Sequence, residues 1–280
     1  NLSQYKLMPY GWKILNRKVD NYDVEWSVLK ELIGKYWHWF VVHLVASEIF
    51  RFFKFKNISL LFFAVGSTAC LVMYNWRFYA ALMVQTMIFY ASGIYLRKKR
   101  FVWLLASFWL FILNALKHEA YFDKLTNLLD ISENKVHDFL VIFAWFILKN
   151  ISFNLERLNK EDDEKFGVKN CLGYVFYLPT FHTGPHVIYS RYMQMLEVKV
   201  EMELPQRIKT LLLQIVRFSF WFVITEVGLH FFYIHFIVMS IPLESLNILA
   251  LFGLSYINAQ FFNNKDIIQH GIPIAFGAFD

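Results

Sequence analysis

The sequence predicts an all-α protein: a polytopic bundle of transmembrane helices with one re-entrant segment. Three observations predict this fold class, namely the composition, the length of the apolar runs, and one run that proline and glycine interrupt. Of the 280 residues, 57% are hydrophobic, 20% are aromatic and only 18% are charged, whereas a soluble domain carries about a quarter charged residues. A single soluble core of this size cannot bury so many Phe, Leu and Ile side chains, so a multi-pass membrane protein is expected.

Charge and cysteine content argue against several other classes of protein. The formal net charge is +6, but the basic residues stand in short connections between apolar runs, where they set membrane topology. No basic face studded with aromatic residues is evident, so we expect no nucleic-acid partner. The two cysteines, Cys70 and Cys171, provide neither a disulfide framework nor a zinc-binding spacing, so no metal site is expected.

The chain divides by composition into two parts. Residues 1–30 form a polar N-terminal segment, whose NRKVDNYDVEWS stretch is typical of a surface segment leading into a helix. Residues 31–280 form the predicted multi-pass membrane domain. Because the chain begins with Asn1 and ends at GIPIAFGAFD, we expect it to be a fragment of a longer protein.

Eight apolar runs of about 20 residues, the length that crosses the core of a bilayer, follow one another along the chain. Seven are uninterrupted and one is broken. The predicted membrane segments are 36–53, 58–76, 78–96, 101–116, 139–155, the interrupted 171–189, 211–236 and 243–262.

Charge asymmetry predicts the orientation of these segments. Basic residues cluster at 51–56 and at 97–100; these clusters lie two segments apart and therefore on the same side of the membrane. The positive-inside rule makes that side cytosolic. Residues 117–138 are then luminal, and the mixed-charge loop 156–170 returns to the cytosol.

The interrupted run 171–189 is predicted to be re-entrant. If it crossed the membrane fully, the basic residues of 190–209 would be luminal, against the charge rule. Pro179 and Pro185 lack amide donors and Gly184 weakens the helix, so several carbonyl groups lose their intrahelical partners. Lipid cannot satisfy those carbonyls, so other helices must surround the turn and leave a cavity beside it.

Four residues at this break are candidates for lining the cavity or for holding the turn: His182, Thr183, Gly184 and Pro185. Ionisable residues within membrane segments are functional candidates, so His182 is a candidate for substrate contact. The alternative is structural: His182 donates a hydrogen bond to a carbonyl that Pro185 frees, and keeps the turn closed.

Polar side chains also stand inside other apolar runs. Glu226 and His230 are four residues apart on one helical face, where they can pair, and His235 follows near the end of the run. They are candidates for a structural pair or for a proton or substrate path; the spacing is not a zinc-protease motif. His43 and Glu48, five residues apart, face different directions and are expected to form interhelical hydrogen bonds.

Five strings resemble, in the same order and over nearly the whole chain, the Hedgehog-acylating members of the membrane-bound O-acyltransferase family. The most specific are the Y-L-P-T-F-H-T-G-P core at 177–185 and the E-x-x-x-H-x-x-x-x-H spacing that starts at Glu226. The five strings stand at 20–27, 174–185, 225–235, 240–243 and 271–273.

The resemblance implies a multi-pass enzyme of the endoplasmic reticulum membrane. Such an enzyme transfers palmitoyl from palmitoyl-CoA, which arrives from the cytosol, to the N-terminal amine of a Hedgehog signalling protein precursor in the lumen. The implied partners are therefore palmitoyl-CoA as donor substrate, the Hedgehog precursor and the lipid bilayer, and no covalently bound cofactor is implied.

The resemblance also implies that no catalytic residue lies in this chain. The family's catalytic His and its partner Asp belong to strings resembling Y-F-D-x-G-L-H and W-H-G, which are expected beyond residue 280. His182 does not match the catalytic His, and Asp280 aligns with an Asp that precedes the catalytic region. We therefore expect the fragment to be inactive. Two alternatives remain open: a non-catalytic relative with the same fold, and a transporter with a broken helix.

Overall fold

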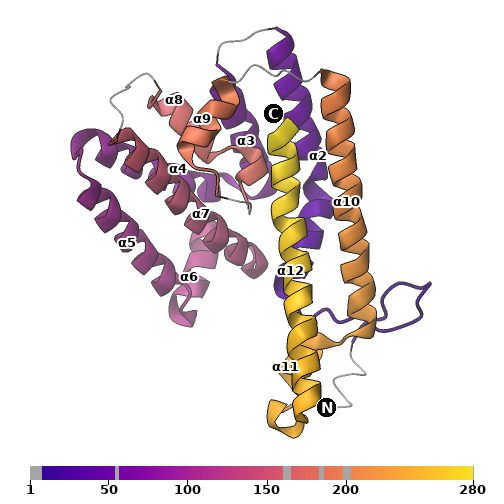
Figure 1. The fold of residues 1–280 in the computed structure, drawn as a ribbon. Helices are drawn as coiled ribbons and strands as arrows, with labels where there is room; N and C mark the ends of the chain where they lie inside the picture. Colours follow the sequence, from indigo (N-terminus) through magenta and orange to yellow (C-terminus); the bar gives the residue numbers. More distant parts are fainter. Residues whose placement is uncertain (1–7, 54–56, 160–164, 183–185, 198–202, 280) are drawn as a thin grey trace. The chain divides into compact units, whose positions relative to one another are not determined.

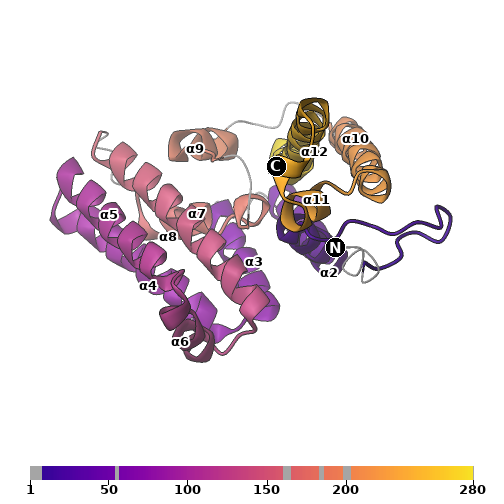
Figure 2. The same cartoon turned by 90° about the horizontal axis from the view of Figure 1, so that it is seen from below.

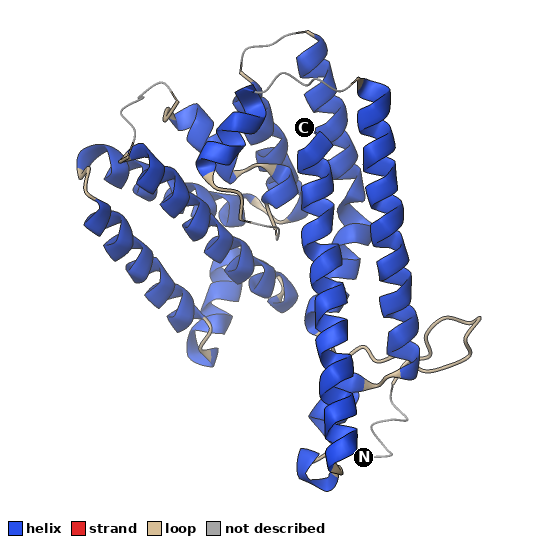
Figure 3. Ribbon diagram, in the orientation of Figure 1, coloured by secondary structure: helices blue, strands red, loops and turns tan. Residues whose placement is uncertain are grey.

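The computed structural model describes residues 8–53, 57–159, 165–182, 186–197 and 203–279, and most of these residues are helical (Figure 3). Within the described ranges no strand occurs beyond an isolated bridge between Tyr10 and Lys18. The predicted all-α fold class is therefore confirmed.

Eleven α-helices and two 3-10 turns follow one another along the described chain (Figure 1). Their bounds, with the labels of the figure, are α2 Val24–Phe52, α3 Ile58–Met73, α4 Trp76–Tyr95, α5 Lys99–Leu116, α6 Glu119–Leu129, α7 Glu133–Arg157, α8 Val168–Val175, η1 Leu178–Thr180, α9 Tyr189–Glu197, α10 Leu204–Phe231, α11 Ile234–Ser240, η2 Leu243–Ser245 and α12 Ile248–Phe279.

Four of the described helices are long and apolar enough to cross a membrane. They are the helices over Trp76–Tyr95, Lys99–Leu116, Lys135–Arg157 and Leu204–Phe231, and the shorter α3 is also apolar. These helices match the predicted segments 78–96, 101–116, 139–155 and 211–236, so the membrane-protein class is confirmed.

Three helix boundaries differ from the sequence prediction, and side chains explain the two that are helix starts. α2 begins at Val24 rather than near residue 36, because the Asp23 carboxylate accepts a hydrogen bond from the Trp26 amide over 2.7 Å and caps the helix. α12 begins at Ile248 rather than 243, where the Asn247 side chain accepts the Ala250 amide over 2.8 Å. α12 then continues to Phe279.

The predicted run 211–236 is broken between α10 and α11. α10 ends at Phe231 and α11 begins at Ile234, so His235 stands on a different helix from Glu226. One oxygen of Asp20 accepts the amides of His235 and Phe236 over 2.7 and 3.2 Å. A carboxylate from a distant part of the chain thus satisfies the amides at the start of α11.

The luminal connection predicted at 117–138 contains a helix, α6. Leu125 and Leu129, four residues apart, are buried, whereas Tyr121 and Leu128 are exposed. This spacing places the two buried leucines on one face. α6 is an amphipathic helix that packs against α5 and α7.

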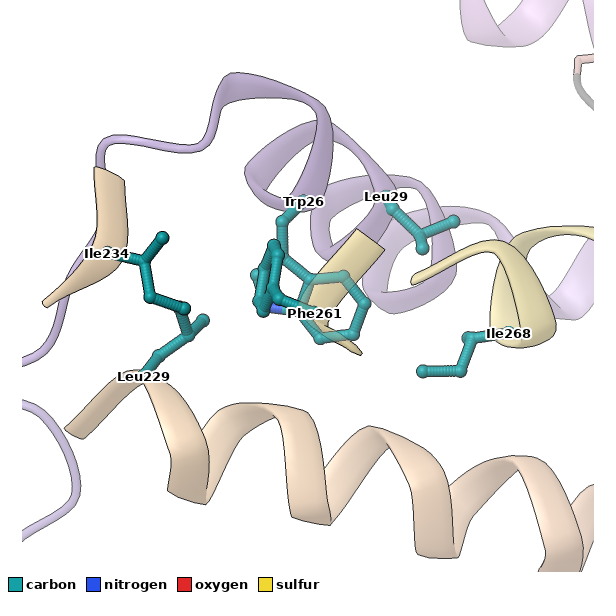
Figure 4. Packing of buried hydrophobic residues seen from close by; sticks show 6 residues of the cluster. All are labelled: Trp26, Leu29, Leu229, Ile234, Phe261 and Ile268. Carbon is teal, nitrogen blue, oxygen red and sulfur yellow. The ribbon is translucent and has the colours of Figure 1, made fainter. Parts of the chain in front are cut away.

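The chain forms two compact units, the first from Asn1–Trp37 and Pro205–Ala275 and the second from His38–Leu204 and Phe276–Asp280. In the first unit α2, α10, α11 and α12 share a core (Figure 4). Trp26 is 1% exposed there, and its ring centroid lies 5.2 Å from that of Phe222.

The NRKVDNYDVEWS stretch is therefore not a surface segment over its whole length, because its C-terminal part packs into this core. The division at residue 30 stays a prediction.

The second unit is built around α3, α4, α5 and α7. α4 and α5 both pack on α7, and α8 packs along α3 (Figure 2). Polar side chains join α4 and α7 inside this bundle: Gln85 donates to the Phe143 carbonyl over 3.2 Å, and Gln85 and Asn150 are fully buried. Such hydrogen bonds commonly join membrane helices.

Candidate functional site

The candidate site in the second unit is the interrupted segment, which breaks where the sequence predicts. α8 ends at Val175, Pro179 stands in the 3-10 turn η1, and the next helix of the described residues, α9, begins at Tyr189. Thr183, Gly184 and Pro185, three of the predicted site residues, lie outside the described residues. His182 is described and is half-buried.

The first half of the segment follows α3 from its beginning to its end. A Cβ atom on Gly173 would lie 2.5 Å from the Ser59 carbonyl oxygen, and one on Gly66 would lie 1.9 Å from that of Phe176. Further along, His182 meets Tyr74, the residue that follows α3. Glycine is needed at both crossings because the two backbones touch there.

The second half of the segment returns to where it began. The Tyr174 hydroxyl donates to the Val187 carbonyl over 2.6 Å, and the Tyr189 hydroxyl donates to the carbonyl of Lys165, ahead of α8. The Tyr189 amide donates to Ser152 near the end of α7 over 3.0 Å. Entry and exit therefore lie together, which is the geometry of a re-entrant segment.

A buried lysine supports the break from α7. Lys149 is 3% exposed, and its ammonium group donates to the Val175 carbonyl, at the end of α8, over 3.0 Å. The rings of Phe146 and Tyr174 lie beside the ammonium group, each centroid 6.0 Å away. Lys149 thus satisfies one of the carbonyls that the end of α8 leaves without a helical partner.

Within the described residues, His182 contacts a tyrosine side chain and no backbone carbonyl. Its Nδ1 lies 3.3 Å from the Tyr74 hydroxyl, which also lies 3.5 Å from the Asp138 carboxylate. Its Nε2 is buried and has no hydrogen-bond partner within the described residues. The carbonyls beside Pro185 lie outside the described residues, so the carbonyl partner of His182 stays a prediction. Among the described residues, it is Lys149 that donates to a carbonyl freed at the break, that of Val175. Sequence reasoning missed Lys149, although a lone lysine inside an apolar run is a signal that could have found it.

In the first unit Glu226 and His230 are both buried, but they do not form the predicted side-chain pair. Glu226 Oε1 accepts a hydrogen bond from Trp26 Nε1 over 2.6 Å and lies 2.9 Å from the Lys30 ammonium group. His230 Nδ1 lies 2.6 Å from the Glu226 carbonyl oxygen, and its Nε2 accepts the Trp12 amide over 2.9 Å. Because Nε2 is an acceptor, the proton of the neutral ring is on Nδ1.

A second polar cluster lies nearby in the same unit, and sequence reasoning did not predict it. Asp23 lies 3.1 Å from Lys265 and 3.2 Å from His235 Nε2. Burial alone would raise the pKa of Asp23, but the hydrogen bonds from His235, the Trp26 amide and Lys265 outweigh burial and hold the pKa well below its usual range. Conversely, the carboxylates of Asp20 and Asp23 raise the pKa of His235 to about 9, against the effect of burial.

Residues 91–264 match the model of the MBOAT family, the membrane-bound O-acyltransferase family. The chain belongs to the membrane-bound O-acyltransferase family. The matched region includes the interrupted segment and the Glu226, His230 and His235 positions, so these candidate residues lie in the part of the chain that characterises the family.

Two acyltransferase relatives are similar to this chain. It is 23% identical over 279 residues to Drosophila melanogaster protein-cysteine N-palmitoyltransferase Rasp, covering 97% of this chain and 54% of the relative. It is 29% identical over 103 residues to Mus musculus protein-cysteine N-palmitoyltransferase HHAT, covering 36% of this chain and 21% of the relative. The chain thus spans about half the length of the first relative and less of the second.

Other polar residues of this family member take partners within its helices. Glu48 forms an ion pair with Arg51 on α2, and the interhelical hydrogen bonds expected of His43 and Glu48 stay a prediction. His43 is fully buried between the rings of Phe62 and Tyr177, with centroids 4.9 and 5.3 Å away. Over the residues described, no three His, Cys, Asp or Glu side chains gather in a group that could hold a metal ion.

Proposed function

We propose that this chain is part of a protein-cysteine N-palmitoyltransferase of the endoplasmic reticulum membrane. The enzyme transfers palmitoyl from palmitoyl-CoA to the N-terminal amine of a Hedgehog signalling protein precursor. The observation that carries the proposal is the similarity to Rasp, a protein of that named activity, along 97% of this chain. The membrane-spanning helices and the family membership support it.

The proposed reaction forms one amide bond and breaks one thioester. A general base removes a proton from the N-terminal ammonium group of the acceptor, and the free amine attacks the palmitoyl carbonyl. The carbon–sulfur bond then breaks, and coenzyme A leaves as a thiol that carries a proton. A protein that crosses the bilayer suits this chemistry, because the donor arrives from the cytosol and the acceptor from the lumen.

The role we assign to the described residues is support of the reaction site rather than chemistry. We propose that His182, Thr183, Gly184 and Pro185 shape the turn of the re-entrant segment, and that Lys149 on α7 supports the segment at the Val175 carbonyl. Glu226 and His230 join α10 to the N-terminal part of the chain. The base and its Asp partner are proposed to lie beyond residue 280.

The test is palmitoyl transfer by the full-length protein that contains this chain, purified into lipid nanodiscs. Palmitoyl-CoA with a terminal alkyne is the donor, and a Hedgehog N-terminal peptide that begins with cysteine is the acceptor. We expect a hydroxylamine-resistant amide on the free peptide and none on the same peptide with an acetylated N-terminus.

The 280-residue chain, assayed in parallel, is expected to give no product above a protein-free control. If the full-length protein binds the donor but transfers nothing, it is the non-catalytic relative. Turnover by the 280-residue chain would place the base among the residues present here, with His182 the first candidate. A transporter is not favoured by any described contact.

A further inference from the structure

A short hairpin of residues 9–18 projects from the first unit and carries an unusual set of exposed side chains. The bridge between Tyr10 and Lys18 closes it, the Gly11 amide donates to the Arg17 carbonyl over 2.9 Å, and Asn16 turns the chain with φ of 44°. The loop is visible beside the lower end of α10 in Figure 1. We call residues 9–18 the N-terminal hairpin.

The tip of the N-terminal hairpin is apolar and basic at once. Ile14 is 88% exposed, Tyr10 73% and Trp12 38%. Lys13 and Arg17 are exposed beside them, and no acidic residue occurs within 9–18. Water is a poor environment for Ile14 and Tyr10 at this degree of exposure. The same set of Trp, Tyr and basic side chains is enriched where a membrane meets water.

His230 fixes the hairpin to the end of a membrane-spanning helix. The Trp12 amide donates to His230 Nε2 over 2.9 Å, and a Cβ atom on Gly11 would lie 1.9 Å from that nitrogen, so only glycine allows the approach. The Arg17 guanidinium lies 4.6 Å from the ring centroid of Phe231. The hairpin therefore stands at the level of the last turn of α10.

The length of α10 places that last turn at a bilayer surface, with Arg217 and Glu226 standing within the helix. Arg207 and Lys209 stand near the start of α10, and Phe231 is its last residue. The roughly 22 residues from Lys209 to Phe231 extend for about 33 Å in a helix, close to the hydrocarbon thickness of about 30 Å. If the basic end lies at one surface, Phe231 and the hairpin lie at the other.

We propose that the N-terminal hairpin is a membrane-surface anchor, whose Tyr10, Trp12 and Ile14 insert among lipid headgroups while Lys13 and Arg17 contact lipid phosphates. The partner is the bilayer in which α10 stands. Shallow insertion matches both the aromatic side chains and the basic ones, because each has an apolar body and a polar end. The anchor fixes the depth of the N-terminal segment that packs on α10.

The test places a bimane fluorophore on Ile14→Cys in the full-length protein, reconstituted into nanodiscs that contain anionic phospholipid. The native Cys70 and Cys171 are buried, and the unsubstituted protein gives the labelling background. Asn159→Cys, at an exposed turn after α7, is the control site. We expect headgroup spin-labelled lipid to quench the probe at residue 14 but not at 159, and aqueous iodide to do the reverse.

Two further variants distinguish insertion from other kinds of burial. Tyr10→Cys should repeat the pattern if Ile14→Cys harms folding, and Lys13→Glu with Arg17→Glu should reduce lipid quenching at residue 14. Iodide quenching at residue 14 equal to that at 159 would refute the anchor. Protection from iodide without lipid quenching would also refute it, and would indicate a protein surface covering the hairpin.

Discussion

Trp26 Nε1 donates a hydrogen bond to Glu226 Oε1 over 2.6 Å and joins α2 to α10 across 200 residues of sequence. Both residues are buried, and the Lys30 ammonium group lies 2.9 Å from the same oxygen. A carboxylate inside a membrane protein is costly unless it is paired. Glu226 therefore stabilises the first unit through two donors from α2.

The first prediction concerns the acceptor at residue 226. Glu226→Leu leaves the Trp26 donor without a partner, which costs about 1–3 kcal/mol of unfolding free energy. Glu226→Gln keeps an acceptor for Trp26, so its unfolding free energy should fall less than that of Glu226→Leu. Thermal unfolding in detergent would rank the two variants, and equal stability of both with the native protein would contradict the role of this hydrogen bond.

The second prediction concerns pH and His235. Asp20 and then Asp23 raise the pKa of His235 from 6.5 to about 9, so its contribution to stability is complete below 6.5 and is lost as the pH rises toward 9. The native melting temperature should fall over this range. His235→Gln should be less stable at pH 6.5 and should lack that fall.

The matched control for His235 is His270→Gln, at a partly exposed histidine of α12 whose Nδ1 lies 3.9 Å from the Asp266 carboxylate. This control should keep the native pH profile. If the melting temperature of His235→Gln changes in parallel with that of the native protein between pH 6.5 and 9, His235 does not cause the pH dependence of stability.

The third prediction concerns Lys149. Lys149→Met removes the donor from the Val175 carbonyl and leaves that carbonyl unsatisfied at a buried position, at a cost of about 1–3 kcal/mol. Lys169→Met, on the exposed start of α8, is the control and should change little. The measurement is thermal unfolding of both variants. If Lys149→Met unfolds at the same temperature as the native protein, Lys149 does not support the break.

The fourth prediction concerns His182 in the full-length protein and rests on the palmitoyl transfer proposed for it. If its role is structural, His182→Ala and Tyr74→Phe should each lower stability by about 0.5–3 kcal/mol, and palmitoyl transfer should be reduced rather than abolished. His186→Ala, at a neighbouring exposed residue, is the control. A His182→Ala protein with native stability and no transfer would instead make His182 a contact of the substrate.

The parts of the fold that sequence predicts are those that local chemistry decides. The membrane helices follow from the lengths of the apolar runs, and the break at Pro179 follows from a missing amide donor. The contacts of the candidate site are different, because they join residues far apart in the chain. Nothing in the local sequence of Val175 indicates Lys149 as its partner, and only the folded chain brings Asp20 to the amide of His235, 215 residues away.

The same distinction explains the errors at Glu226 and His230. Their spacing of four residues correctly places them on one face of α10, but each side chain also has a partner from the N-terminal part of the chain. The local sequence also does not predict that α10 ends at Phe231, because the carboxylate that caps α11 belongs to Asp20, far away in the chain. Periodicity predicts which face a residue occupies and leaves its partner undetermined.

The central structural claim is that the segment from α8 to α9 turns back within the membrane, with entry and exit on one side. Glycosylation acceptor sites engineered one at a time at Asn159, Glu203 and Asp130 test it in microsomes. We expect glycosylation at 130 alone, because charge asymmetry and the re-entrant fold predict that 159 and 203 both face the cytosol. Efficient glycosylation at 203, with none at 159, would mean that the segment crosses the bilayer and would contradict the re-entrant fold.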